Sequence, residues 1–152
     1  MKLAEALAER ADLQTRHAQL VARAKQSARY QEGETPPEDA VALLAELDRI
    51  AERLERLIVR INVQNMATVV SPGVSMTAAL ARRDTLRRLQ KSRTELADAA
   101  ATPQDRYSRT ELRSFAAVDV KALRDAADAY AKEARELDTL IQEINWTTEM
   151  AE

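Results

Sequence analysis

The chain has 152 residues, 45% of them hydrophobic, so it is long enough for one domain with an apolar core and too short for two ordinary domains. Aromatic residues make up only 3% and glycine occurs twice, a composition that argues against β-sandwiches and barrels and favours long helices. Charged residues make up 32%, but the net charge is only -2, so the chain as a whole lacks the charge excess that attracts nucleic acid or anionic lipid.

The compartment is predicted from two further features of the sequence. Cysteine is absent, which favours a reducing compartment. Glu5, Glu9 and Arg10 interrupt the apolar segment that a secretory signal would need, and no apolar run is long enough to cross a bilayer. We therefore expect a cytoplasmic protein that does not associate with membranes.

The first predicted helix covers residues 2–30. Its apolar positions recur at alternating steps of three and four, the spacing of a coiled-coil seam, and two of these positions are polar. Gly33, Pro36 and Pro37 should end this helix, because glycine suits a helix C-terminus and proline cannot continue the hydrogen-bond ladder. The predicted seam residues are Leu3, Ala6, Arg10, Leu13, His17, Leu20 and Ala24.

The second predicted helix, residues 38–66, has the clearest pattern in the chain. It opens with proline and acidic residues, which a helix N-terminus favours. Glu52 and Arg56 lie on the opposite face from the apolar stripe, as expected for a solvated surface. The predicted seam residues are Ala40, Leu44, Leu47, Ala51, Leu54, Ile58 and Ile61.

Residues 68–76 break the helical rhythm, because two short β-prone runs flank Ser71-Pro72-Gly73 and predict a β-hairpin. Thr77 is the expected N-cap of a third helix over residues 77–101. Its stripe includes two arginines. The predicted seam residues are Ala79, Arg82, Leu86, Leu89, Arg93, Leu96 and Ala100.

The remainder of the chain is predicted to hold an extended segment and a fourth helix. Glu111, Arg113, Phe115 and Ala117 alternate with Leu112, Ser114, Ala116 and Val118. A third strand over residues 110–118 that pairs with the hairpin is therefore expected. A helix follows over residues 119–145, with heptad spacing that continues without a break. Its predicted seam residues are Val120, Leu123, Ala127, Tyr130, Ala134, Leu137, Ile141 and Ile144.

These elements predict a mainly α fold: a single domain over residues 1–152, built as an elongated bundle of four long helices with coiled-coil-like seams, a small β-hairpin and a third strand. Each helix would reach roughly 40 Å. Narrow seams on helices of this length leave apolar surface uncovered in one copy, so a homo-oligomer is expected. Most of the core should come from Leu44, Leu47, Leu54, Ile58, Ile61, Leu123, Tyr130, Leu137, Ile141 and Ile144.

The candidate binding residues are cationic. The stretch from Arg82 to Arg93 carries six cations and one acid, Asp84, and a polar loop with more arginines follows it. These cations could bind phosphate groups or nucleic acid, or they could pair with the acidic second and fourth helices. We favour ion pairing between helices. The candidate ligand-binding residues are Arg82, Arg83, Arg87, Arg88, Arg106, Tyr107 and Arg109.

No catalytic residue, metal ligand or cofactor site is predicted, and no specific small-molecule ligand is evident. His17 is the one histidine, and Gln14 stands three residues before it, so the Glu-x-x-His pair of di-iron bundles is missing. A polar layer in the helix seam is the favoured interpretation of His17. Ser108 has no partnered histidine within sequence reach to act as its base, so nucleophilic catalysis is not expected.

Five segments resemble a known family. They are Met1 to Leu7, Ala81-Arg82-Arg83-Asp84, Arg106-Tyr107-Ser108-Arg109, Val118-Asp119-Val120 and Asn145-Trp146-Thr147-Thr148-Glu149. Together they resemble a family of small bacterial helical proteins of unknown function, some of them labelled septicolysin. The resemblance spans nearly the whole chain. It implies a helical fold with oligomeric assembly and supplies no catalytic or binding residues.

The favoured function is a non-enzymatic helical oligomer that acts as an interaction or scaffold protein. The alternative is nucleic-acid or phosphate-ligand binding through the Arg-rich third helix and the loop after it. Membrane lysis, which the septicolysin label suggests, is less favoured, because a pore needs a strongly apolar surface and every predicted helix carries a charged face.

Overall fold

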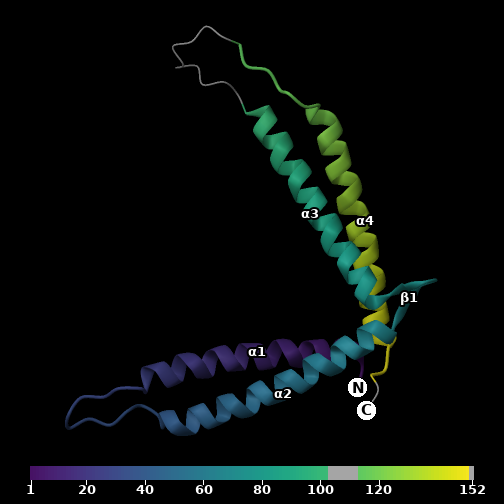
Figure 1. Cartoon of the computed structure of the whole chain (residues 1–152). Coiled ribbons are helices and arrows are strands. Elements are labelled where there is room, and N and C mark those ends of the chain that lie inside the picture. Colours follow the sequence, from purple (N-terminus) through teal and green to yellow (C-terminus); the bar gives the residue numbers. More distant parts are fainter. Residues whose placement is uncertain (103–112, 151–152) are drawn as a thin grey trace. The chain divides into compact units, whose positions relative to one another are not determined.

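The computed structural model describes residues 1–102 and 113–150 of the chain. Its elements are α1 (Leu3–Gln26), α2 (Ala40–Ala67), β1 (Val69–Ser71), β2 (Val74–Ser75), α3 (Met76–Ala101) and α4 (Val120–Thr147) (Figure 1). The predicted mainly helical fold with a small hairpin is therefore confirmed.

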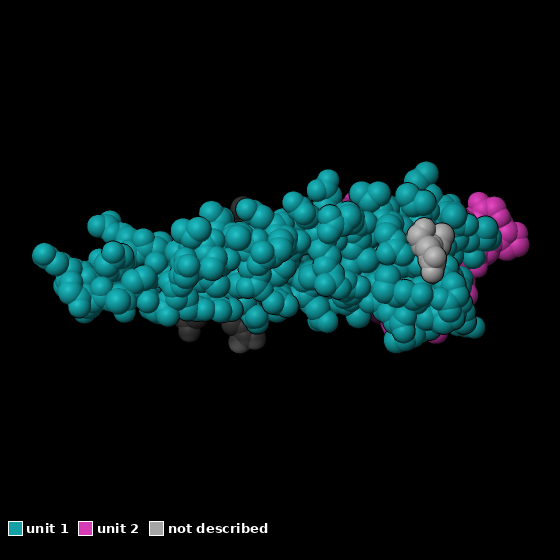
Figure 2. Space-filling view, turned by 90° about the horizontal axis from the view of Figure 1, so that it is seen from below, with its two compact units in different colours: residues 1–69, 143–152 teal, residues 70–142 magenta. Residues whose placement is uncertain are grey.

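The chain divides into two compact units, which are described separately. Unit 1 comprises Met1–Val69 and Glu143–Glu152, and unit 2 comprises Val70–Gln142. Unit 1 contains α1 and α2, and its surface is long and narrow (Figure 2). Unit 2 contains α3 and most of α4, which lie side by side (Figure 1).

The helix starts follow from side-chain caps. The Asp39 carboxylate accepts hydrogen bonds from the backbone N–H groups of Val41 (2.9 Å) and Ala42 (3.1 Å), so it caps α2. Ser75, and not Thr77 as predicted, caps α3, because its hydroxyl accepts from the N–H of Ala78 at 3.2 Å. Gly73 takes a φ of 76° in the turn of the hairpin, a conformation that glycine adopts without steric strain.

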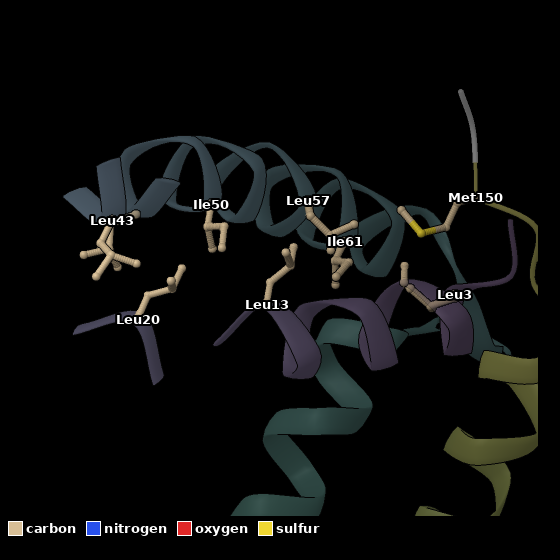
Figure 3. Packing of buried hydrophobic residues seen from close by; sticks show 10 residues of the cluster. Leu3, Leu13, Leu20, Leu43, Ile50, Leu57, Ile61 and Met150 are labelled. Atoms are coloured by element: carbon tan, nitrogen blue, oxygen red, sulfur yellow. The ribbon is translucent and has the colours of Figure 1, made fainter. Parts of the chain in front are cut away.

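The core of unit 1 is a single apolar seam between α1 and α2 (Figure 3). The seam predicted for α1 is confirmed at its apolar positions: Leu3, Ala6, Leu13 and Leu20 are buried, and Ala24 is half-buried and packs against them. The polar positions, Arg10 and His17, are half-buried. On α2 the buried side chains again repeat at steps of three and four. The core residues are Leu3, Ala6, Leu13, Leu20, Leu43, Leu47, Ile50, Leu57, Ile61 and Met150.

The predicted seam of α2 is wrong in one of its two rows. Leu43 is only 6% exposed, whereas Leu44, which was expected in the core, is 56% exposed. The helix has three apolar rows at seven-residue spacing, and α1 packs on two of them. The rows are 43/50/57 and 47/54/61, which face α1, and 44/51/58, which does not form the seam.

The two ends of the chain meet within unit 1. The N–H of Leu3 donates to the carbonyl of Thr148 at 3.0 Å, and the N–H of Met150 donates to the carbonyl of Met1 at 2.9 Å. The Met150 side chain is 7% exposed and packs beside Leu3 and Ile61 at the end of the seam (Figure 3). The C-terminal segment therefore closes this end of the core.

In unit 2 the seam predicted for α4 is confirmed, and the seam predicted for α3 is partly wrong. Ala127, Ala134 and Ile141 are buried on α4, and the other predicted seam residues within the unit are half-buried. On α3, Arg82 is exposed although it was expected in the seam, and Arg83 is half-buried there instead. The buried residues of α3 are Met76, Ala79, Leu86 and Ala97.

Two further predictions need correction. α1 ends at Gln26, because Ser27 forms its C-cap, so it does not reach residue 30. Residues 113–118 do not form the predicted third strand, and Phe115 there is 81% exposed. Residues 110–112 of that prediction lie outside the described residues.

Candidate functional site

Three of the predicted cationic residues on α3 form ion pairs with α4. Arg82 binds Glu133 at 2.7 Å, and Arg83 binds Asp138 at 2.9 Å. Arg87 reaches the same Asp138 oxygen at 3.3 Å. The interpretation of these cations as partners of an acidic neighbouring helix therefore accounts for these three side chains.

The remaining predicted residues are not brought into one site. Arg88 is exposed, and no ion pair involving it is found among the described residues. Arg106, Tyr107 and Arg109 lie outside the described part of the chain. Of the four predicted residues that the structure describes, three are ion-paired and Arg88 is not.

Between α3 and α4 lies a groove of about 470 Å³. Five polar side chains line it, together with Ala131 and Ala134, whose small side chains leave the hollow. Gln90 occupies a position on the seam side of α3, opposite these alanines. The polar lining residues are Arg87, Gln90, Arg135, Asp138 and Thr139.

In unit 1, one flank of the α1–α2 seam is joined by ion pairs. Arg53 binds Glu9 with a 2.9 Å contact from Nε, and the pairs Arg16–Glu46 and Arg23–Glu38 continue the row. Glu9, Arg16 and Arg23 are seven residues apart, so they share one edge of α1. Their partners run in the opposite direction along α2, as expected for an antiparallel helix pair.

The other flank of the same seam is apolar. A groove of about 410 Å³ lies there, with Ala51, Leu54, Ile58 and Val59 of α2 in its lining. Val59 is 55% exposed. The groove was not predicted, although the third apolar row of α2, 44/51/58, was the signal for it. Its remaining lining residues are Gln14, His17 and Glu55.

His17 faces this groove as a lone imidazole. Across residues 1–102 and 113–150, no cluster of three or more His, Asp, Glu or Cys side chains could hold a metal ion. Within the same residues, no helix is both long and apolar enough to cross a membrane.

Two surface carboxylates in unit 1 have perturbed acidity. The hydrogen bond from Arg23 lowers the pKa of Glu38, against a smaller effect of desolvation. Hydrogen bonds from Lys2 (2.6 Å) and the N-terminal amino group (3.4 Å) lower the pKa of Glu149. Both carboxylates therefore stay ionised at pH values where an ordinary glutamate begins to be protonated, and they bind their cations as charged groups.

Comparison with known proteins places the chain in a family whose function is unknown. The model of a family of unknown function, DUF6847, matches residues 10–150. The chain is also 40% identical to a functionally unknown conserved protein from Corynebacterium diphtheriae, whose crystal structure it matches over 99% of each chain with a TM-score of 0.94. No curated protein matches the chain significantly. Neither match supports the septicolysin label, and the predicted membership in a helical family of unknown function is confirmed. The chain belongs to the family of unknown function DUF6847.

Proposed function

We propose that this protein is a non-enzymatic helical oligomer that acts as an interaction or scaffold protein, and that two copies assemble through the apolar groove of the α1–α2 hairpin. One observation carries this proposal: the two flanks of a single seam differ. One flank is closed by three ion pairs, and the other presents the row Leu44, Ala51 and Ile58.

The apolar flank favours a helical partner. A pair of helices can bury only one seam against each other, and Leu44 and Val59 remain more than half exposed. Burying such side chains is favourable because apolar surface leaves water. Four antiparallel helices, two from each copy, are the usual arrangement that covers a second apolar row.

The size of the surface suits a stable dimer. α1 has 24 residues, which corresponds to a length of about 36 Å, and two adjacent helices are about 20 Å wide. This face would bury roughly 700 Å² on each copy, or about 1,400 Å² in total, which lies within the range of specific protein–protein interfaces.

Charge favours a second copy of the same chain as the occupant. His17 of α1 and Glu55 of α2 line the groove. Arg10 and Asp48 lie seven residues before them, and therefore on the same edges of their helices. A two-fold axis parallel to the helices would place α1 of one copy against α2 of the other. The cationic and acidic rims would then face each other.

Arg10 fits this arrangement in detail. Its Nε atom is buried without a hydrogen-bond partner, and none of the ion pairs among the described residues includes it. Its neighbour Glu9 pairs with Arg53, so Arg10 lies at a level between Asp48 and Glu55 along the bundle. The guanidinium of one copy would therefore lie within about one helical turn of either acid on the second copy.

Light scattering coupled to size-exclusion chromatography tests the proposal. The wild-type chain should have twice the mass of one copy, and Leu44→Glu should have the mass of one copy, because the new carboxylate would be buried without a partner. The matched control is Ala45→Glu, which adds the same charge at an exposed position on the other side of α2. It should remain a dimer.

Two results would contradict the proposal. One is a wild-type chain that stays monomeric at high concentration. The other is a dimer whose mass is unaffected by Leu44→Glu although circular dichroism shows that the variant is folded, since assembly would then use another surface.

A further inference from the structure

The groove between α3 and α4 has an unbalanced charge. Arg87 and Arg135 supply two guanidinium groups to its lining, and Asp138 supplies the only carboxylate of the lining. The nearest cation to this carboxylate is Arg83, at 2.9 Å, whose side chain is 19% exposed. Arg87 contacts the same oxygen at the longer distance of 3.3 Å. The carboxylate is therefore engaged mainly by a residue outside the lining.

Arg135 is the second cation of the groove, and none of the ion pairs found within the described residues includes it. Arg83 itself is shared between Asp138 and Asp84, so these three groups carry one positive and two negative charges. Arg87 and Arg135 add two positive charges beside them. The groove thus holds two guanidinium groups whose hydrogen-bonding capacity is largely unused.

The polar neighbours add a neutral donor. The side-chain amide of Gln90 lines the groove and can donate to an oxyanion. The Thr139 hydroxyl, by contrast, donates to the carbonyl of Arg135 at 3.0 Å, so its proton is already used. Ala131 and Ala134 leave room for an anion to approach these donors.

We propose that this groove binds the phosphate group of a small phosphorylated ligand, held by Arg87 and Arg135 with Gln90 as a further donor. Guanidinium groups match the oxygens of phosphate through paired N–H donors, and charge-assisted hydrogen bonds of this kind are stronger than neutral ones. The site is separate from the dimer surface proposed on α1 and α2. It does not require that surface to be correct.

Heteronuclear NMR of the ¹⁵N-labelled full chain tests this proposal with three probes: inorganic phosphate, a nucleoside monophosphate and a short single-stranded oligonucleotide. Sodium chloride at matched ionic strength controls for screening. Phosphate and the monophosphate should shift the Nε–H signals of Arg87 and Arg135 in a saturable manner, and chloride should not.

Variants distinguish a built site from general attraction. Arg135→Gln and Arg87→Gln should each weaken phosphate binding by about three- to tenfold, while the backbone amide spectrum shows that the fold is kept. The matched control is Arg88→Gln, which removes an exposed arginine of the same helix that does not line the groove. It should bind phosphate as the wild-type chain does.

Three outcomes would overturn the proposal. The first is no saturable shift with either phosphate or the monophosphate. The second is equal loss in Arg88→Gln and Arg135→Gln, which would mean diffuse electrostatic attraction. The third is binding of the oligonucleotide alone, since that would point to an extended backbone contact along α3 rather than to this groove. Because the readout is local to unit 2, each outcome is independent of the mass of the assembly.

Discussion

Leu43 and Leu44 are adjacent in sequence, but they should respond differently to substitution by alanine. Leu43 is 6% exposed in the α1–α2 seam, and Leu44 is 56% exposed on its apolar flank. Removing a buried leucine side chain loses its transfer free energy and leaves a cavity, which together cost about 2–5 kcal/mol. Leu43 lies in the first turn of α2, where neighbours can relax, so we expect about 2–3 kcal/mol.

Leu44→Ala should cost less than about 1 kcal/mol in a single copy, because less than half of its side chain leaves water on folding. In a dimer the same change would also remove interface contacts. A 100-fold rise in protein concentration stabilises a dimer by about 2.7 kcal/mol. The cost of Leu44→Ala should therefore grow with concentration, and that of Leu43→Ala should not.

Urea denaturation followed by far-ultraviolet circular dichroism at two concentrations, 100-fold apart, measures both effects. Equal destabilisation of the dilute protein by Leu44→Ala and Leu43→Ala would contradict this prediction. Row 44/51/58 would then belong to the seam within one copy, and the register of the two helices would be different from that in the structure.

Three further predictions concern capping, acidity and surface charge. Asp39→Ala should destabilise α2 by about 1 kcal/mol, because two N–H groups lose their acceptor, whereas Asp39→Ser should keep most of the stability; thermal melting compares the two. Lys2 and the N-terminal amino group lower the pKa of Glu149 in the folded chain. The ionised carboxylate therefore stabilises the fold at pH values above its unfolded pKa, near 4.5, and this stabilisation is lost as the pH falls through the lower folded pKa. The melting temperature of Glu149→Gln should accordingly fall less steeply between about pH 5 and pH 2 than that of the wild-type chain, and parallel curves would contradict this. Arg53→Ala and Glu9→Ala should show a coupling free energy of only about 0.2–1 kcal/mol in a double-mutant cycle, since the arginine side chain is 62% exposed; a much larger coupling would mean that the pair is desolvated.

The sequence predicts the four helices well because their apolar spacing is long and regular. It predicts the seam of α1 correctly, since the leucines at positions 3, 13 and 20 lie in one pair of rows, and the neighbouring row 4/11/18 holds only alanine. α2 has three apolar rows, and periodicity alone cannot decide which two face a partner. Which rows face α1 depends on partners that are far away in the sequence. The ion pairs of Arg53 with Glu9, Glu46 with Arg16 and Glu38 with Arg23 fix one flank of α2 against α1.

Partners that are distant in the sequence also explain why the seam of α3 in unit 2 was predicted wrongly. Arg82 and Arg83 are equivalent by charge, and the position of Asp138 on α4 determines which of them enters the seam. The candidate groove depends on that same meeting of two helices, so Arg135 could not be identified beforehand. The alternation over residues 110–118 predicted a strand, which residues 113–118 do not form. A strand also needs a neighbouring edge of sufficient length, and β1 and β2 have only three and two residues.

The most direct test of the central claim is a spin label on the groove itself. The chain contains no cysteine, so Gln14→Cys, in the groove lining, and Ala45→Cys, on the other side of α2, each provide one labelling site. Assembly across the groove predicts an immobilised nitroxide at position 14 with dipolar broadening that disappears on dilution with unlabelled wild-type chain, and a mobile, unbroadened nitroxide at position 45. A mobile and unbroadened label at position 14, at concentrations where the chain has twice its single-copy mass, would contradict the account.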